Sequence, residues 1–524
     1  MRHLLLAVLF TALSLSITAE TVNVGGIMYK LGTDGTAEIT SKSPAYTGDI
    51  FVPDSFEYSS QWYKVTKVGQ NAFLGTTVTS LRFPNSLKTI ENWSIASCTS
   101  LHTIDFGTGL TTIKSSALQG CSSLRKLVFS DSLQTVGTGA FKQCTSLDSV
   151  IFGAGLKSIG DYAFDGCKKL TYARLSDSLE TMGVQLFYNC DTLLYMNIPD
   201  RIQVLGKETF INCRNLKEVT FGAGLKKISF KAFYGCTHLE RAILQDSVEE
   251  IEYDAFNGCT RLSKLRLSNS LIRIGDRAFQ FCNSIDTALT FPATLKSIGS
   301  HCFRKCFLIP EIAFSEGIDS IYNNAFDSCF AISEVILPNS LTYLGDESFR
   351  RCESMKYLET GIGIKDILKN TFLGCIALDS ITLGDSLKTI GENAFAGDTS
   401  LNRIRSLAVA PPECYNMNVF DYALYFSAYL YVHGQSVEPY RTDEVWGRFI
   451  PHILPLDRVA VENVEQARGY YVENGFVRNP DNDFIKIYDI RGAFVGETDA
   501  DFDLNTLPKG VYILRGKFTT KVVN

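Results

Sequence analysis

Hydrophobic residues return along most of the chain with a period of 23 residues. One unit of this pattern, residues 144–166, reads CTSLDSVIFGAGLKSIGDYAFDG. A fixed period of this size is typical of a solenoid, in which each repeat packs only on its neighbours. The apolar positions of the unit, which we expect to face the core, are Leu147, Val150, Phe152, Leu156, Ile159, Ala163 and Phe164.

The spacing inside the unit predicts its local structure. Leu147, Val150 and Phe152 follow the pattern L-x-x-L-x-L, and the alternation at its end predicts a short strand. The next three residues, GAG here and PNS, GTG, SDS, SNS or PAT elsewhere, are mostly turn formers. The remaining segment, L-x-x-I-G-x-x-A-F, should return the chain through a second short extended piece and a helical turn.

Two residue types mark the period. A phenylalanine fills one inward position in most coils, Ile95 and Leu118 replace it in two, and the count gives about fifteen coils. Cysteines keep the 23-residue spacing except for one step of 24 residues between Cys282 and Cys306. Thr76 and Asp398 hold the cysteine's place at the two ends. The thirteen cysteines of this column are Cys98, Cys121, Cys144, Cys167, Cys190, Cys213, Cys236, Cys259, Cys282, Cys306, Cys329, Cys352 and Cys375.

The regular spacing favours buried thiols over other uses of cysteine. Identical apolar settings should raise the thiol pKa and make a nucleophile of this kind inert. Cys302 and Cys306 form C-x-x-x-C beside His301, but a structural zinc site needs four ligands, and Cys302 occupies the small core position of Ala163. Successive coils bring equivalent positions within bridging range, so some disulfides, or a partner for Cys414, remain alternatives.

The repeat resembles the BspA-like (Bacteroides surface protein A) class of leucine-rich repeats, whose unit is I-G-x-x-A-F-x-x-C-x-x-L-x-x-V-x-L/F-P-x-S-L. The resemblance covers roughly residues 62–405. It implies an α/β-type leucine-rich repeat solenoid, β-rich, of about fifteen 23-residue coils, with β-rich caps and a small C-terminal β module. The chain lacks the usual asparagine or cysteine after the strand, so asparagine-ladder geometry is not implied.

The flanking segments complete the expected domain organisation. Residues 1–19, MRHLLLAVLFTALSLSITA, have the composition of a secretory signal peptide. Residues 20–61 resemble an N-terminal β-rich cap, residues 62–405 form the solenoid, and residues 406–460 resemble a C-terminal cap. Residues 461–524 contain three strand-like runs, at 485–489, 511–514 and 521–523, and resemble a short form of the sorting domain used in type IX secretion. A small β module without an export role is the alternative.

Composition and motifs exclude several function classes. The net charge is −6, so the chain lacks the excess of basic residues that nucleic-acid binding requires. The apolar run after the leader at residues 422–432 is too short to span a membrane. The six histidines form no H-E-x-x-H, and the G-x-G at Gly361 and Gly363 lies inside a coil. We therefore expect no catalytic site, no metal and no cofactor.

A partner should bind on the outward face of the predicted strands, at the residues five and seven after each cysteine. In the middle of the repeat these positions carry tyrosine and basic residues, which are enriched in interface hot spots. The candidate ligand-binding residues are Tyr172, Arg174, Tyr195, Asn197, Arg241, Lys264 and Arg266. Further along, Glu311, Glu334 and Glu359 would make the same face acidic. Cross-strand stabilisation by these tyrosines is the alternative.

These features favour a secreted or cell-surface protein on the outer membrane exterior that binds host or bacterial surface proteins or glycans. The adhesin role is implied by the family resemblance, because fold alone does not fix function. A structural envelope component without a specific ligand is the main alternative. An enzyme with an unrecognised site is a weaker one, since repeated coils leave no place where catalytic groups converge.

Overall fold

The computed structural model of the chain describes residues 20–456 and seven strands beyond them, at 471–473, 476–478, 485–489, 494–498, 502–503, 511–515 and 519–523. The expected signal peptide, residues 1–19, lies outside the described residues. The chain divides into two compact units, residues 1–430 with 438–453 and residues 431–437 with 454–524. The first unit contains all of the repeats.

Each coil of the first unit contains two short strands joined by turns. In the coil that starts at Cys144, β13 (Ser149–Ile151) is followed by a turn and then by β14 (Ser158–Ile159). The seven apolar residues assigned to the core of this coil are at most 3% exposed. The predicted inward positions, the first strand and the second extended piece are therefore confirmed.

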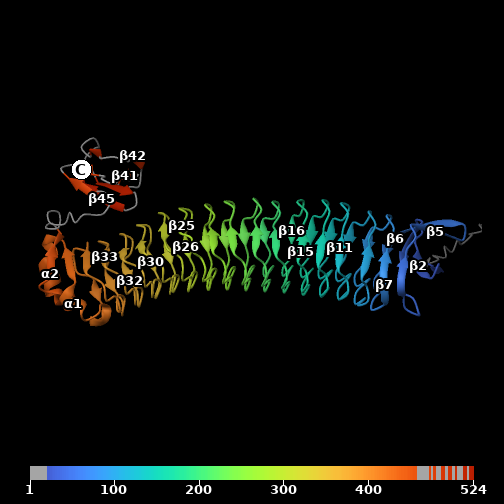
Figure 1. Cartoon of the computed structure of the whole chain (residues 1–524), viewed down its shortest axis with the longest axis horizontal. Coiled ribbons are helices and arrows are strands. Elements are labelled where there is room, and N and C mark those ends of the chain that lie inside the picture. Colours follow the sequence, from blue (N-terminus) through green and yellow to red (C-terminus); the bar gives the residue numbers. More distant parts are fainter. Residues whose placement is uncertain are drawn as a thin grey trace, which may run out of the picture. The chain divides into compact units, whose positions relative to one another are not determined.

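The first strands of successive coils stack in parallel along the unit (Figure 1). Residues paired across neighbouring strands occupy the same place in their coils, as Val150 and Ala173 do. There are fifteen of these strands among the described residues: β7 (Thr77–Arg82), β9 (Thr103–Asp105), β11 (Lys126–Val128), β13, β15 (Tyr172–Arg174), β17 (Tyr195–Asn197), β19 (Glu218–Thr220), β21 (Arg241–Ile243), β23 (Lys264–Arg266), β25 (Leu289–Phe291), β27 (Ile312–Phe314), β29 (Glu334–Ile336), β31 (Tyr357–Glu359), β33 (Ser380–Leu383) and β35 (Arg403–Ser406).

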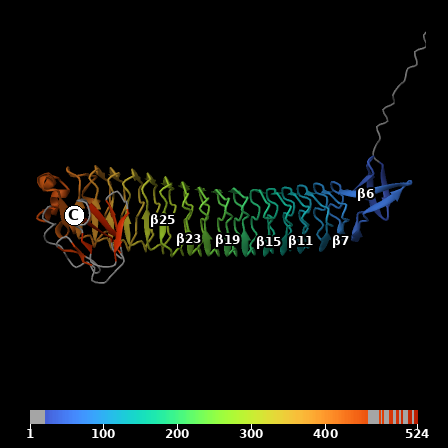
Figure 2. The same ribbon diagram turned by 90° about the horizontal axis from the view of Figure 1, so that it is seen from above.

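The second strands form another parallel series, and Figure 2 shows the successive coils side by side from above. All fifteen are two residues long, because the chain turns again at once. They are β8 (Thr89–Ile90), β10 (Thr112–Ile113), β12 (Thr135–Val136), β14, β16 (Thr181–Met182), β18 (Val204–Leu205), β20 (Lys227–Ile228), β22 (Glu250–Ile251), β24 (Arg273–Ile274), β26 (Ser297–Ile298), β28 (Ser320–Ile321), β30 (Tyr343–Leu344), β32 (Asp366–Ile367), β34 (Thr389–Ile390) and β36 (Glu413–Cys414).

The segment that leads into the next coil consists of turns, so the predicted helical turn is wrong. Tyr162 and Gly166 have φ values of 59° and 73°, and the equivalent residues of the other coils are also left-handed. A residue with positive φ interrupts a right-handed helix. Some backbone hydrogen bonds of this segment lead to the next coil and others close a local turn. Phe164 N–H donates to Leu186 O in the next coil at 3.0 Å, whereas Cys167 N–H donates to Phe164 O, three residues earlier, at 3.1 Å.

The phenylalanine column forms a continuous stack through the core. From Phe141 to Phe420, neighbouring ring centroids are 4.9–5.8 Å apart and the rings lie within 5–20° of parallel. Offset stacking at this separation adds to the free energy of apolar burial. The repeated phenylalanine is therefore one core position, as the period predicts.

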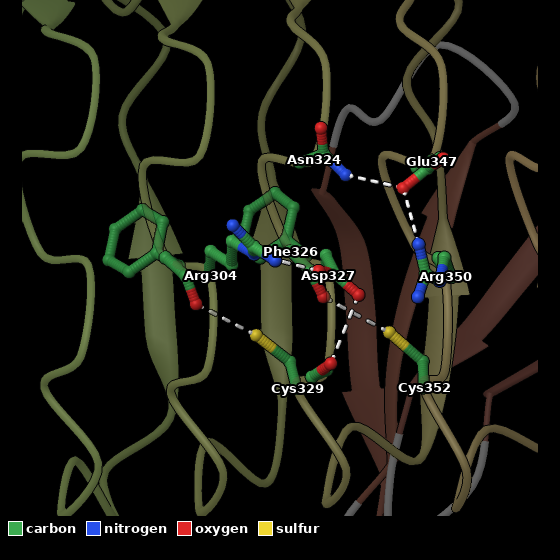
Figure 3. Close-up of polar contacts among 10 residues, drawn as sticks. Arg304, Asn324, Phe326, Asp327, Cys329, Glu347, Arg350 and Cys352 are labelled. Atoms are coloured by element: carbon green, nitrogen blue, oxygen red, sulfur yellow. Dashed lines mark hydrogen bonds and ion pairs between the residues drawn. The ribbon is translucent and has the colours of Figure 1, made fainter.

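The cysteine column lies beside it, and all fifteen cysteines are free thiols. Each columnar thiol donates to a backbone carbonyl of the preceding coil. Figure 3 shows Cys352 Sγ donating to Phe326 O at 3.5 Å, and Cys329 Sγ donates to Phe303 O at 3.1 Å. The column therefore links neighbouring coils without disulfides.

The amino-terminal residues cover the first coil. The elements are β1 (Thr21–Val24), β2 (Ile27–Leu31), β3 (Thr36–Ile39), β4 (Thr47–Phe51), β5 (Ser55–Tyr58) and β6 (Gln61–Val68). Strand β4 pairs in parallel with β7, and β6 pairs in parallel with β8. The buried ring of Tyr46 lies 4.7 Å from Phe73, the first member of the phenylalanine column. These contacts close the open end of the core.

The last coil is covered by short helices and by aromatic side chains. The elements of this part of the chain are η1 (Met417–Val419), α1 (Leu424–Ser427), β37 (Tyr429–Val432), η2 (Gly434–Ser436), α2 (Val437–Thr442), η3 (Trp446–Phe449) and β38 (Ile453–Pro455), of which η2 belongs to the second unit. Phe420 adds one more ring to the column. Trp446 and Phe449 pack edge-on against it, with ring centroids 5.5 and 5.6 Å from that of Phe420. Trp446 Nε1–H donates to Pro412 O at 2.8 Å, which fixes the indole.

The second unit contains small antiparallel sheets. One has the order β42 (Phe494–Thr498), β41 (Ile485–Asp489), β44 (Val511–Arg515) and β45 (Thr519–Val523). The other contains β39 (Tyr471–Glu473), β40 (Phe476–Arg478) and β43 (Phe502–Asp503). The three predicted strand-like runs coincide with β41, β44 and β45. Among the described residues, no helix is both long enough and apolar enough to cross a membrane.

Candidate functional site

The outward face of the longer strands presents the seven residues that the sequence singles out. In β15 and β17 the middle residue is buried, so the residues on either side of it point outward. Tyr172 is 50% exposed and Tyr195 is 55% exposed. Arg174, Asn197, Arg241, Lys264 and Arg266 are exposed as well. We call this surface the strand face.

The pairing register arranges these residues in rows along the stack. Tyr195 lies beside Glu218, Arg241 lies beside Lys264, and Ile243 lies beside Arg266. Strands β11, β13 and β15 form one sheet, and β17, β19, β21 and β23 form the next. The two tyrosines therefore flank a boundary between sheets. Arg241, Lys264 and Arg266 lie together within the second sheet, and Arg174 lies in the first.

Each basic residue of this sheet has an acidic neighbour from an adjacent coil. All six side chains are about half exposed, so each pair contributes only ~0.2–1 kcal/mol to stability. Such a pair is easily exchanged for a contact with a partner. The pairs are Arg241 with Glu218 at 3.7 Å, Lys264 with Asp286 at 2.8 Å and Arg266 with Asp246 at 2.9 Å.

The 24-residue coil interrupts the strand face directly after these basic residues. The sheet ends at β23, and the next sheet begins with β25, whose buried and exposed positions are reversed. A hollow of about 460 Å³ lies at the break, and Arg241, Lys264 and Arg266 line it together with Thr287 and Thr290. The structure thus gathers three of the seven predicted residues at one hollow. The other four do not line it, because they lie on β15 and β17, which β19 separates from β21: Tyr172, Arg174, Tyr195 and Asn197.

Beyond the break, the strand face becomes acidic. Glu311 and Glu334 are exposed, and Glu334 belongs to β29. Partial burial, with a smaller effect from the Glu311 carboxylate, raises the pKa of Glu334 above its usual value. Tyr357 hydroxyl donates to Glu359 Oε2 at 2.9 Å in β31. The face therefore carries basic and acidic regions on opposite sides of the 24-residue coil.

The thiols have no access to this surface. Cys302 and Cys306 are completely buried, Cys302 in the place that Ala163 takes in its own coil. Burial raises the pKa of both thiols well above the usual value, and Cys306 Sγ donates to Phe279 O at 3.2 Å. Within the described part of the chain, no group of three or more His, Cys, Asp and Glu side chains is arranged to hold a metal ion.

Sequence reasoning concentrated on the longer strands and missed a second hollow next to the short ones. This hollow has a volume of about 430 Å³ and is lined by Tyr253 and Tyr322 among others. Gly275 and Gly299, which directly follow β24 and β26, also line it. The signal in the sequence is a glycine that follows the second strand in many coils and that Tyr322 replaces in its own.

Several solved structures are similar to the chain. A leucine-rich repeat protein from Bacteroides ovatus shares 22% identity, with 73% of this chain and 94% of that chain covered and a TM-score of 0.46. One from Eubacterium ventriosum shares 19% identity, with 73% and 95% covered and a TM-score of 0.38. The pneumococcal vaccine antigen PcpA shares 16% identity, with 84% and 97% covered and a TM-score of 0.35. No match was found among the curated proteins.

A family model matches the repeats directly. The model, described as BspA type leucine rich repeat region, matches residues 66–194, 185–288 and 287–402 and is found in six copies. These ranges cover more than half of the chain and most of the expected solenoid.

Proposed function

Since the chain belongs to the BspA-type leucine-rich repeat family, we propose that it is an exported, non-enzymatic surface protein. It binds protein or glycan ligands through the strand face, in an adhesin-like role. Export is supported by the leader-like composition of residues 1–19 and by the resemblance of residues 461–524 to a type IX sorting domain. The protein is therefore located at the cell surface or is released from it.

One observation carries this proposal. The strand face exposes large side chains that the repeat does not require. Val150 and its counterparts recur because every coil buries the same core. The place that Tyr172 and Tyr195 hold in their coils carries serine or glutamate in neighbouring coils, so the repeat does not require tyrosine there, yet both tyrosines are about half exposed on the outward face of the strands. Exposed tyrosine beside arginine is the composition of an interface hot spot.

The charge pattern supports a macromolecular partner. Fifteen strands at a spacing of ~4.8 Å give a face roughly 70 Å long, which suits a protein or a long glycan better than a metabolite. The basic region around Lys264 and the acidic region around Glu334 lie apart along this face. A partner with complementary charges would be oriented along the stack.

The test compares two triple variants of the exported protein. Tyr172→Ala, Tyr195→Ala and Arg266→Ala remove the proposed contacts, and binding is measured on a glycan array and on immobilised extracellular-matrix proteins. Since exposed substitutions usually change stability by less than ~0.5 kcal/mol each, thermal unfolding should change little. Binding should weaken at least about thirtyfold, the equivalent of one hot spot of ~2 kcal/mol.

The matched control removes two tyrosines and one arginine from other surfaces, by Tyr234→Ala, Tyr422→Ala and Arg261→Ala. Tyr234 and Tyr422 are exposed outside the longer strands, and Arg261 is exposed in a turn. The control should bind as the unmodified protein does. Equal binding by both triples would remove the strand face as the site, and no binding by any of the three proteins would favour a structural envelope component.

Export has its own test, because sorting and binding are separate properties. A chain that ends near Asn463 should keep its folded coils and lose surface display. Surface labelling of cells that express both lengths measures this. Normal display of the shorter chain would contradict the sorting role of residues 461–524.

A further inference from the structure

We propose that the hollow next to the short strands is a binding slot for a neutral carbohydrate chain. We call it the tyrosine slot. Its walls are Tyr253 and Tyr322, its floor contains Gly275 and Gly299, and Arg273 and Asp276 are among its polar groups. It lies on the second series of strands, so it is distinct from the strand face.

The repeat explains why the slot exists. Tyr253, Asp276 and Ser300 occupy equivalent places in three successive coils, and Tyr322 follows in the next coil. Large side chains therefore stand at both ends, while the two coils between them carry glycine followed by Asp276 or Ser300. Three coil steps of ~4.8 Å place the two tyrosine backbones roughly 14 Å apart.

The glycine floor is imposed by the packing of the coils. A Cβ on Gly275 would lie 2.5 Å from the backbone nitrogen of Tyr253, and a Cβ on Gly299 would lie 2.5 Å from that of Asp276. Neither distance is possible without moving backbone. The floor therefore stays at backbone level, and the tyrosine rings stand above it.

The two walls present aromatic surface that is already ordered. Phe230 stacks on Tyr253 with ring centroids 4.2 Å apart, and Tyr343 packs against Tyr322 at 5.5 Å. Tyr253 remains 45% exposed and Tyr322 remains 42% exposed. An aromatic ring that is held in place loses little conformational entropy when a ligand covers it.

Arg273 and Asp276, the charged groups of the slot, already have partners within the protein. Arg273 Nη2 lies 2.9 Å from Glu250 Oε1, and Lys227 Nζ lies 3.0 Å from Glu250 Oε2. Asp276 Oδ1 accepts a hydrogen bond from Ser300 N–H at 2.8 Å. An anionic ligand would have to displace Glu250 from Arg273 and would be repelled by the Asp276 carboxylate, whereas a neutral ligand would not.

Hydrogen-bonding capacity nevertheless remains. A guanidinium has five N–H donors and a carboxylate has about four acceptor sites, so Arg273 and Asp276 can each bond further groups. The slot thus combines aromatic faces with donors and acceptors at its floor. A sugar ring matches this, because it has an apolar C–H face and a rim of hydroxyl groups that both donate and accept.

The dimensions also suit a short stretch of glycan. The volume of about 430 Å³ lies within the ~300–1,000 Å³ usual for small-ligand sites. The separation of roughly 14 Å between the backbones of the two wall tyrosines is enough for two linked sugar rings. Because the slot is open to solvent and not enclosed, the ends of a longer chain can extend out of it.

The test uses the full chain without its leader and isothermal titration with neutral tetrasaccharides of glucose, xylose, mannose and N-acetylglucosamine. At least one should bind. Tyr253→Ala with Tyr322→Ala should weaken that binding at least about tenfold, because both walls are lost. Tyr253→Phe with Tyr322→Phe keeps the ring faces and should stay within about threefold of the unmodified protein.

The controls separate this slot from the strand face and from misfolding. Tyr234→Ala with Tyr422→Ala, and the strand-face triple, should both bind the tetrasaccharide normally. Failure of the strand-face experiment therefore leaves this one intact. The proposal is overturned if no neutral tetrasaccharide binds, if a galacturonate tetrasaccharide binds more tightly, or if the double alanine variant binds as the unmodified protein does.

Discussion

The phenylalanine column should carry a large share of the stability of the solenoid, and Phe233 tests this. Its ring contacts Phe210 at 5.2 Å and Phe256 at 4.9 Å in stacked geometry, and Phe221 at 5.8 Å edge-on. Phe233→Ala leaves a cavity between two coils, and the expected loss in the free energy of unfolding is ~3–5 kcal/mol. Phe233→Leu keeps most of the volume but loses three ring contacts, so we expect about 1.5 kcal/mol at ~0.5 kcal/mol each.

Urea denaturation followed by far-UV circular dichroism measures both variants. The control is Phe426→Ala, since Phe426 is exposed on α1 outside the column, and it should change stability by less than ~0.5 kcal/mol. The expected loss in the free energy of unfolding is largest for Phe233→Ala, smaller for Phe233→Leu and smallest for Phe426→Ala. If Phe233→Ala and Phe426→Ala lower the free energy of unfolding equally, the stacked phenylalanine rings do not hold the coils together.

Three further predictions address other columns. Burial raises the pKa of the Cys144 thiol to about 12, so a thiol reagent should label the columnar cysteines only after unfolding; stoichiometric labelling of the native protein would contradict this. Burial raises the pKa of Asp398 well above its usual value, so the buried carboxylate destabilises the folded chain only above pH ~3.8, and increasingly so as the pH rises. Asp398→Asn should therefore raise the unfolding temperature more at pH 7 than at pH 4.5. An equal gain at both pH values would refute the assignment. Gly258 has a φ of 76°, and an added Cβ would meet only the Gly235 backbone at an ordinary contact distance of 3.9 Å. Gly258→Ala should therefore lower the free energy of unfolding by ~1 kcal/mol in urea denaturation, and no loss would exclude backbone strain.

The core of each coil could be predicted from the sequence because it depends on residues of the same coil. Val150 and Phe152 alternate along one strand, and every coil buries the same places. The return segment was predicted less well. A tyrosine is uncommon at positive φ, so nothing in Tyr162 itself indicates a left-handed residue. The signal was in another coil, where Gly139 holds the same place with a φ of 61°.

The candidate site could be predicted only in part, because it depends on neighbouring coils. The alternation of β23 places Lys264 and Arg266 outward. Their partners Asp286 and Asp246 come from other coils, and their distances follow from the register between coils. The hollow beside Arg266 also depends on the extra residue of the 24-residue coil, which reverses the exposed positions of β25. The 23-residue period predicts the features that every coil shares. It does not predict the two hollows, because both lie where the repeat is interrupted.

The hydrogen bonds of the thiols all point the same way along the stack, from each coil to the one before it. Each coil thus presents a thiol donor to its predecessor and a carbonyl acceptor to its successor, and because the same two faces recur at every junction, whole coils could be exchanged for one another. Recombination between repeats could add or remove 23 residues and change the reach of the protein by ~4.8 Å per unit without creating a new contact. Only Thr76, Asp398 and the coil that follows Cys282 have fixed places. Reach can therefore vary among descendants of this chain while both ends and the interrupted coil stay the same.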